Sequence, residues 1–525
     1  MEQGVKKEYV VISEGFAELL NGAQPQAVAV GRGVDAATFA TSSVGGARVV
    51  AKKAAMKRSF APASAKPRPV STRVVQLTDQ ELAREKRANR LTGRIFPVVH
   101  YFPQVVSLPG SDPYGKAVTF TPAKAALQPA AGSAIRAGAA SSVNIEVVDA
   151  ETGSPLKGIE IIGFATKARK NPFRVFTDAA GKAKLAFDSV KLTELWASPP
   201  HTYWSAGKSN VTAHQTVRFE LATWQQTGNR ALDILRNRAA AQVGQGEGVR
   251  VAVIDTGIGK HKDLNIAKNI SIINGAVVAD DRVDVQPHGT HVAGIIAGAP
   301  TKKSGALGIA PKAEIYGYRI FSGRNSGGSN SDLALAILQA TNDKCDVINL
   351  SLSSGERDPL VKAALKFADD RGVLVIAAAG NHTATEVAFP ASEKTVVSVG
   401  AMGCRTTYPK DSLHALRAVK PWGTTKTHFI ARFSNSGANL ICSSVGVAVV
   451  STVPGGKFQA MDGTSMACPA VSAIAACLLS MEEHSEVLRM PPNKARSVAM
   501  RRLLYTACSS LGFDPSRQGK KGLPS

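Results

Sequence analysis

A series of short apolar runs after residue 248 constrains the fold more than any other feature of the sequence. The runs are VRVAVID, AEIYGYRIF, CDVINLSLS, GVLVIAAAGN and TVVSVGAM. Segments that predict helices separate or follow them, near residues 291–299, 331–342, 358–371 and 465–480. Strands that are apolar on both faces and alternate with helices indicate a doubly wound parallel sheet of the α/β class, in which ligands bind beyond the carboxyl ends of the strands.

Changes in composition divide the rest of the 525-residue chain, which is long enough for several domains. Residues 1–120 are expected to form a basic leader or an α+β propeptide, and residues 121–142 an Ala/Gly/Pro/Ser linker. Alternating runs separated by turn residues predict a small all-β sandwich over residues 143–222. The parallel-sheet domain is expected to span residues 228–515.

The leader contains a few local signals of order. Tyr9 to Ile12 predicts a strand, Thr78 to Leu91 predicts a helix that Thr78 could cap, and the apolar run Ile95 to Tyr101 follows. The 143–222 segment, with its ETGSPLKG and TDAAGKA turns, resembles transthyretin-like or carboxypeptidase-regulatory modules. That resemblance implies no chemistry.

The net charge of +23 is concentrated in part in residues 51–100, where twelve Lys or Arg face three acidic residues. Such an arm could favour nucleic acid, anionic lipid or an acidic partner. It has no interleaved aromatic residues and no signature of a nucleic-acid-binding fold, so we expect a solvated basic segment and no nucleic-acid binding.

The sequence shows neither a secretory signal in its first thirty residues nor an apolar run long enough for a membrane span. We therefore expect a cytoplasmic protein without a membrane span, and export by a route that needs no classical signal is the alternative. Six cysteines lie after residue 344 without a metal-binding spacing, which favours free buried thiols over disulfides.

Four polar residues stand where the predicted sheet would keep a site: Asp255, His288, Asn381 and Ser465. Each has an ordinary structural explanation, since Asp255 and Asn381 could be turn residues and Ser465 a helix cap. His288 and His291 could suggest a metal, but no acidic or cysteine ligand has a useful spacing, and packing or a hydrogen bond is the favoured role of His291. Chance seldom places all four at strand ends or helix starts of one sheet.

The segments around these residues, VAVIDTGI, HGTHVAGIIAG, AAAGN and GTSMACP, resemble the motifs of the subtilisin family of serine peptidases over about residues 230–512. The resemblance implies that Ser465 attacks the scissile carbonyl and that His288 carries the proton. It further implies that Asp255 orients the histidine, and that Asn381 and the Ser465 N–H stabilise the oxyanion. No cofactor is needed for this chemistry.

The resemblance also implies a substrate groove that binds extended peptides by strand pairing. Two segments match its sides: Ser351, Leu352 and Ser353 on one, and Ser326, Gly327 and Gly328 on the other. Without the other motifs, a bare strand edge and a glycine-rich loop explain these segments equally well. The N-terminal segment is weakly similar to a propeptide, which would act as an intramolecular inhibitor.

Three positions depart from the family pattern. Pro287 precedes His288 where glycine is usual, so the backbone must accept a fixed φ and a missing N–H. The loop after Asn381 is short. Lys302 and Lys303 stand where many relatives place oxygen ligands for calcium, and Asp263 alone is insufficient, so we expect no metal there.

The sequence thus predicts a serine endopeptidase that acts on protein or peptide substrates and is made as a self-processing zymogen. An alternative is a binding protein in which the same fold is a latent scaffold, recruited through the sandwich or the basic arm.

Overall fold

The structure is a computed structural model. It describes residues 6–20, 40–44, 47–51, 71–87, 94–106, 141–166, 172–224, 230–237, 241, 243–302, 305–324, 326–383, 386–418 and 423–524. Residues 121–140 of the predicted linker and half of the basic arm, residues 52–70 and 88–93, lie outside this set. The last two residues of the predicted linker, 141 and 142, instead begin strand β7.

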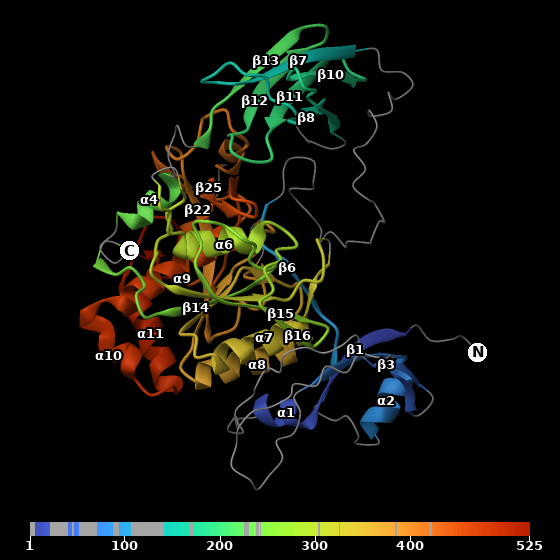
Figure 1. Ribbon diagram of the computed structural model, residues 1–525, viewed down its shortest axis with the longest axis vertical. Coiled ribbons are helices and arrows are strands. Elements are labelled where there is room, and N and C mark those ends of the chain that lie inside the picture. Colours follow the sequence, from blue (N-terminus) through green and yellow to red (C-terminus); the bar gives the residue numbers. More distant parts are fainter. Residues whose placement is uncertain are drawn as a thin grey trace.

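A nine-stranded, mostly parallel sheet forms the centre of the largest part of the chain (Figure 1). Its order is β16-β15-β17-β14-β19-β21-β22-β23, with β24 also paired to β22. Only β16 and β23 run antiparallel to their neighbours. The strands are β14 (Arg250–Asp255), β15 (Ile266–Ile273), β16 (Ala276–Ala279), β17 (Glu314–Arg319), β19 (Val347–Leu350), β21 (Leu374–Ala378), β22 (Val396–Cys404), β23 (His428–Ile430) and β24 (Cys442–Val445). The α/β class with parallel strands is as predicted.

Helices cover both faces of this sheet because successive residues of each strand point to opposite sides. In β14, Val251 and Val253 join the buried cluster that contains α6 (His288–Ala297) and α9 (Thr464–Ser480). Ala252 and Ile254 join the cluster that contains α7 (Asn330–Asn342) and α8 (Pro359–Asp370). All four helices were predicted from the sequence to within a few residues.

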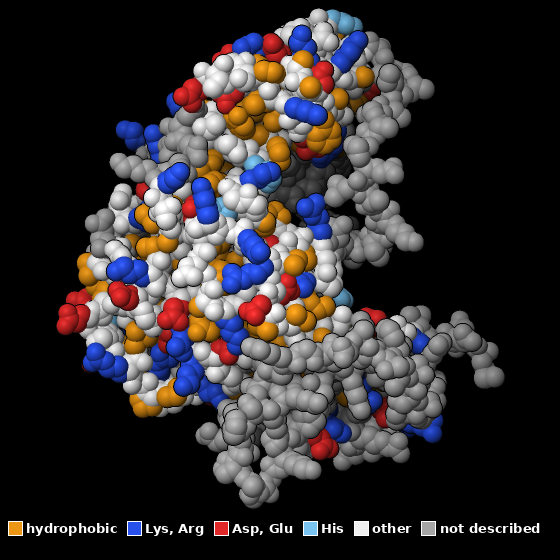
Figure 2. All heavy atoms as spheres, in the orientation of Figure 1, with side chains coloured by type: hydrophobic (Ala, Val, Ile, Leu, Met, Phe, Trp, Pro, Cys, Tyr) orange, Lys and Arg blue, Asp and Glu red, His pale blue; other side chains and the backbone are white. Residues whose placement is uncertain are grey.

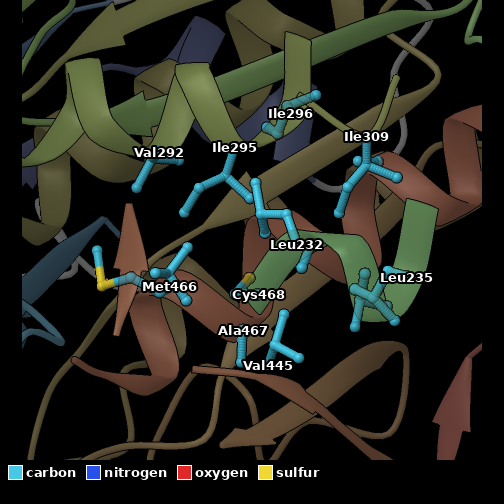
Figure 3. Close-up of a cluster of buried hydrophobic side chains, with 14 of the residues drawn as sticks. Leu232, Leu235, Val292, Ile295, Ile296, Ile309, Val445, Met466, Ala467 and Cys468 are labelled. Carbon is cyan, nitrogen blue, oxygen red and sulfur yellow. The ribbon is translucent and has the colours of Figure 1, made fainter. Parts of the chain in front are cut away.

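The cluster under α6 and α9 also takes in α4 (Arg230–Arg236) and α11 (Lys494–Thr506). Figure 3 shows Leu232 of α4 beside Ile295 and Ile296 of α6, above Met466 and Cys468 of α9. These side chains are almost fully buried. The helix that carries Ser465 is therefore held between the sheet and two further helices.

Residues 141–224 form two sheets around one buried cluster, which we call the two-sheet unit. The first sheet has the order β10-β7-β13 and the second β12-β11-β8-β9. The strands are β7 (Ser141–Asp149), β8 (Glu160–Phe164), β9 (Phe173–Phe176), β10 (Lys182–Phe187), β11 (Lys191–Ser198), β12 (Ala206–Thr212) and β13 (Thr216–Leu221). They lie within or next to residues 143–222, for which the sequence predicts a sandwich, and that sandwich and its likeness to a named module stay predictions.

An N-terminal sheet of order β4-β1-β5 packs beside α7 and α8 (Figure 1). It consists of β1 (Lys7–Ile12), β4 (Thr72–Leu77) and β5 (Ile95–Pro97), with α1 (Glu14–Leu20) and α2 (Asp79–Arg87). Val10, Ile12 and Phe16 enter the cluster of α7 and α8. Thr78 caps α2 as predicted, because Thr78 Oγ1 accepts from Glu81 N while Thr78 N donates to Glu81 Oε2.

The remaining elements are short. They are β2 (Ala40–Val44), β3 (Ala47–Ala51), β6 (His100–Pro103), β18 (Gly328–Ser329), β20 (Leu352–Ser353), η1 (Leu413–Arg417), β25 (Val449–Val453), β26 (Lys457–Met461), η2 (Glu482–His484), α10 (Ser485–Arg489), β27 (Cys508–Ser509), α12 (Pro515–Gln518) and β28 (Leu523–Pro524). All six cysteines are free thiols, and all but Cys508 are buried.

On the face shown in Figure 2, Lys and Arg side chains are scattered among Asp and Glu and do not form one patch. Among the residues that the structure describes, no single helix is long and apolar enough to cross a membrane. The bent pair Thr464–Ser480 and Glu482–Arg489 meets that criterion only when its two parts are taken together.

Leu232 tests whether the packing of α4 supports the fold. Leu232→Ala leaves a cavity between α4 and α6, so we expect the free energy of unfolding to fall by about 2–5 kcal/mol in urea titrations. Leu307→Ala is the matched control, because Leu307 is 41% exposed, and should change it by less than about 1 kcal/mol. Equal effects of the two substitutions would contradict the packing described.

Candidate functional site

The polar residues singled out in the sequence meet at the carboxyl edge of the central sheet. Asp255 ends β14, His288 begins α6, Asn381 follows β21, and Ser465 is the second residue of α9. The strands β14, β19 and β21 are neighbours in the sheet. Their ends therefore bring together groups that lie up to about two hundred residues apart in the sequence.

Asp255 and His288 form a buried pair. The Nδ1 atom of His288 lies 2.7 Å from Oδ1 of Asp255, and the two side chains are 3% and 2% exposed. The other ring nitrogen, Nε2, is buried without a hydrogen-bond partner. When Nδ1 donates to the carboxylate, Nε2 carries a lone pair and can accept a proton.

Two residues that the sequence did not single out hold this pair in place. Thr256 Oγ1 donates to Oδ1 of Asp284 at 2.7 Å and accepts from Gly289 N at 2.9 Å. Oδ2 of Asp284 accepts from Thr290 N at 2.9 Å, in the first turn of α6. Burial raises the pKa of Asp284 to about 6. A lone Asp in a loop gives no sequence signal for such a role.

Pro287 fits the turn before His288. Its φ of −69° lies within the range that the proline ring imposes. Thr256 and Asp284 accept hydrogen bonds from the N–H groups of Gly289 and Thr290 and so hold the first turn of α6. The departure from the family pattern is therefore accommodated without strain.

The backbone around Ser465 is shaped by a glycine before it and a proline after it. A Cβ atom on Gly463 would lie 2.3 Å from the carbonyl oxygen of Gln104, so only glycine permits that close approach. Pro469 lacks the N–H that would bond to the Ser465 carbonyl within the helix. The hydroxyl of Ser351 donates to that carbonyl instead, at 3.0 Å.

The hydroxyl of Ser465 donates to the carbonyl of Ser351 at 2.7 Å. Nε2 of His288 has no partner, so the serine hydroxyl must turn about its χ1 bond before it can donate to the histidine. The arrangement holds the serine and the base at one edge without joining them by a hydrogen bond.

Asn381 presents the unpaired nitrogen of its side-chain amide beside Ser465. Its Oδ1 accepts from the backbone N and the hydroxyl of Thr464, at 3.0 Å and 2.9 Å. These two bonds fix the amide, and Nδ2 is left buried with no partner. A buried unpaired donor is costly unless a ligand satisfies it, so this amide is a ready donor to an incoming oxygen.

The segment 99–106 of the N-terminal part lies in a groove across this site. β6 pairs antiparallel with β18 on one side and with β20 on the other. Tyr101 is opposite Gly328, and Phe102 is opposite Ser353. In Figure 1, β6 lies on the central domain, away from the N-terminal sheet.

Most of the predicted groove residues contact this segment. Leu352 and Ser353 pair with Pro103 and Phe102, and the Ser351 carbonyl accepts from Gln104 N at 3.1 Å. On the other side the pairing residues are Gly328 and Ser329, with Gly327 against His100. Ser326 instead bonds within its own loop, because its hydroxyl accepts from Gly323 N at 2.8 Å and donates to the Gly323 carbonyl at 2.9 Å.

Gln104 places a carbonyl group at the serine. Its oxygen accepts from Ser465 N at 3.0 Å. Its side chain is held by Asn381 N, which donates to Oε1 at 3.2 Å, and by the Phe102 carbonyl, which accepts from Nε2 at 3.0 Å. Beyond the next residue, Val106 N donates to the Asp462 carbonyl at 2.7 Å. The Gln104–Val105 peptide bond therefore lies directly at Ser465.

Asp462 anchors the loop that leads to Ser465. Its carboxylate lies 2.6 Å from Nδ1 of His414 and accepts from Arg417 Nε and Ala448 N, both at 2.8 Å. Burial alone would raise its pKa, but His414 and Arg417 hold the pKa of Asp462 well below its usual range. His414 also meets the ring of Trp204, edge to face at 5.5 Å, which links the two-sheet unit to this loop.

Within the described residues, no group of three or more His, Cys, Asp or Glu is arranged to hold a metal ion. Asp263 is buried, and its carbonyl accepts from Ala299 N at 2.8 Å, just before the loop that carries Lys302. The absence of calcium there stays a prediction.

Comparison with known proteins agrees with the α/β fold of this part of the chain. The model of the subtilase family, Peptidase_S8, matches residues 246–520, which is slightly more than half of the 525-residue chain. The chain therefore belongs to the subtilase family.

Similar proteins include M-protease from Shouchella clausii and Subtilisin Savinase from Lederbergia lenta, each 38% identical over 231 residues, or 44% of this chain. A thermostable alkaline protease from Halalkalibacterium halodurans is 34% identical over 274 residues. The match spans 54% of M-protease, 76% of Savinase and 65% of the thermostable protease, so it reaches only about half the length of the first.

His291 should make the stability of the folded chain depend on pH. Its Nε2 lies 2.9 Å from the Gln459 carbonyl, and burial lowers its pKa to about 3. In the unfolded chain, this histidine has an ordinary pKa of about 6.5 and becomes protonated below that pH. In the folded chain it stays neutral down to a much lower pH, so protonation favours unfolding. Stability should therefore fall as pH drops from about 6.5 toward 3, by about 2 kcal/mol between pH 7 and 5.

Urea unfolding of the Ser465→Ala chain, which lacks the serine that the sequence predicts as nucleophile, measures this effect of His291 on stability. His291→Gln in that background should lose stability less steeply between pH 7 and 5. His214→Gln, at an exposed histidine, is the control and should keep the original slope. Identical slopes for all three proteins would show that His291 is not held neutral.

Proposed function

We propose that this protein is a serine endopeptidase in which Ser465 is the nucleophile, His288 the general base and acid, and Asp255 the residue that orients the histidine. The observation that carries the proposal is the unpaired, buried Nε2 of His288, whose Nδ1 is fixed by Asp255 at the sheet edge that also carries Ser465. The similarity to M-protease and Subtilisin Savinase supports it.

In the proposed reaction, Ser465 turns toward His288 and attacks a carbonyl carbon as Nε2 takes its proton. The carbonyl oxygen becomes an anion that accepts from Ser465 N and from Nδ2 of Asn381. Both donors are already positioned, so they need no reorganisation as charge develops. His288 then gives the proton to the leaving amine, and water releases the acyl group by the same steps.

We propose further that the N-terminal part is an intramolecular inhibitor and that the chain cuts itself between Gln104 and Val105. The supporting observations are the strand pairing of β6 on both sides and the bond from Ser465 N to the Gln104 carbonyl. A peptide held in this way is presented as a substrate before the cut and blocks the groove as a product after it.

Other substrates would be proteins or peptides in extended form, bound by the same backbone contacts. A cytoplasmic location and the absence of nucleic-acid binding remain predictions from the sequence.

The self-processing proposal has a direct test. Intact-mass and N-terminal analysis of the purified chain after incubation should reveal fragments that end at Gln104 and begin at Val105. A fluorophosphonate probe should label the processed protein. Ser465→Ala should stay intact and unlabelled, because it lacks the nucleophile. Equal masses and equal labelling for the two proteins would reject the proposal.

Asn381 should matter for turnover more than for binding. Removing one oxyanion donor typically lowers kcat by about 100- to 1,000-fold, a range known from a subtilisin. We expect this loss for Asn381→Ala with a quenched peptide, and a small change in KM. Asn439→Ala, in the loop before β24, is the matched control and should keep kcat. A kcat within about threefold of wild type for Asn381→Ala would contradict the assigned role.

A further inference from the structure

Tyr101 is the most deeply inserted side chain of the segment that lies in the groove. It is 0% exposed and belongs to the same buried cluster as Leu352, Leu360 and Phe389. Its ring is tilted against that of Phe389, with centroids 6.3 Å apart. Tyr101 stands three residues before Gln104, so it is the fourth residue before the bond that lies at Ser465.

The phenol of Tyr101 meets a buried carboxylate at the end of this pocket. Its hydroxyl donates to Oδ2 of Asp358 at 3.3 Å, and Asp358 is 1% exposed. Burial, and then the charge of Asp358, raise the pKa of Tyr101 well above its ordinary value. The phenol therefore keeps its proton and is the donor.

Asp358 is also the N-cap of α8, and its two carboxylate oxygens accept hydrogen bonds from different donors. Oδ1 accepts from Leu360 N at 2.9 Å and from Val361 N at 3.3 Å. Oδ2 points to the phenol. A serine or an asparagine would cap the helix equally well, and a carboxylate at this position adds a second acceptor aimed into the groove.

We propose that Asp358 is a specificity-determining residue that selects tyrosine over phenylalanine at the fourth position before the cut bond. The proposal rests on the peptidase function proposed above and names the substrates it prefers. Tyr101 is the first such residue to occupy the pocket, and the corresponding tyrosine of a substrate replaces it once the segment has left.

The discrimination has a simple physical origin. Phenylalanine would fill the same apolar walls but would remove the Tyr101 hydroxyl from Oδ2 of the buried Asp358. The carboxylate would then keep only the backbone donors of α8 and the side chain of Asn330. A site with a buried polar group rejects a ligand that lacks the matching hydroxyl more strongly than an apolar pocket rejects a slightly wrong shape. For a hydrogen bond to a charged group, the expected preference is on the order of 10- to 100-fold in kcat/KM.

The first experiment tests the contact without any need for catalysis. In the full-length Ser465→Ala chain, hydrogen–deuterium exchange is followed by mass spectrometry for peptides that cover residues 97–106. Tyr101→Phe should speed exchange there by about 10-fold. In the Asp358→Ser background, which keeps a cap on α8, Tyr101→Phe should add less than about twofold. Equal effects in both backgrounds would overturn the proposal.

The second experiment measures selectivity in the self-processed protein. Two quenched peptides share the sequence Phe-Pro-Gln-Val after either tyrosine or phenylalanine. The wild type should prefer the tyrosine peptide by about 10-fold or more in kcat/KM, and Asp358→Ser should lose most of that preference. Asn493→Ser changes the N-cap of α11, away from the groove, and should retain it.

The outcomes separate the two proposals. Cleavage of both peptides at equal rates by the wild type would overturn the role of Asp358 and leave the peptidase function standing. Cleavage of neither peptide, with no fluorophosphonate labelling, would reject the peptidase function. The exchange measurement would then decide whether the hydrogen bond between Asp358 and the Tyr101 phenol stabilises the bound segment.

Discussion

Burial of the central sheet on both faces is the constraint on which the rest of the structure depends. Strands whose residues point into one of two apolar cores favour apolar side chains along their length, so reactive polar groups are best placed where the strands end. Asp255 and Asn381 stand at such ends, and His288 and Ser465 begin the helices that return along one face of the sheet. The packing of the core therefore brings these groups together at one edge of the sheet. Backbone groups that are unpaired at this edge can bind another segment of chain.

The segment 99–106 uses those free backbone groups and adds few side-chain contacts of its own. Pairing with β18 and β20 sets its direction and register, and Gly463 lets the Gln104 carbonyl approach Ser465 N. Backbone pairing is indifferent to sequence, so selectivity depends on the side chains that enter pockets. Tyr101 is the one that is fully buried. Under the proposed role of this segment, one contact, between its phenol and Asp358, stabilises the inhibited chain and also sets a preference among substrates.

The two-sheet unit is connected to the site through a polar link. Trp204 packs on His414, His414 and Arg417 hold the Asp462 carboxylate, and Asp462 precedes the turn that contains Ser465. Gly207 N also donates to the Asp411 carbonyl at 2.8 Å. The unit lies after Val105 in the chain, so a cut at Gln104–Val105 leaves it covalently joined to the central domain. The contacts between the two-sheet unit and the loop of Asp462 are consistent with a unit that stays in the protein after such a cut.

The sequence by itself determined the class of fold, the main strands and helices, and the residues at the sheet edge, because hydrophobic periodicity and strand-terminal polar residues are local signals. It also indicated where a groove would lie, although Ser326 proved to bond within its own loop. Only the tertiary structure decided that Gln104 meets Ser465, that Asp284 and Thr256 support His288, and that Tyr101 meets Asp358, which are 257 residues apart. Those contacts join residues distant in the chain, and no local pattern encodes them. They depend on how the N-terminal segment, the helix caps and the sheet edge pack in three dimensions.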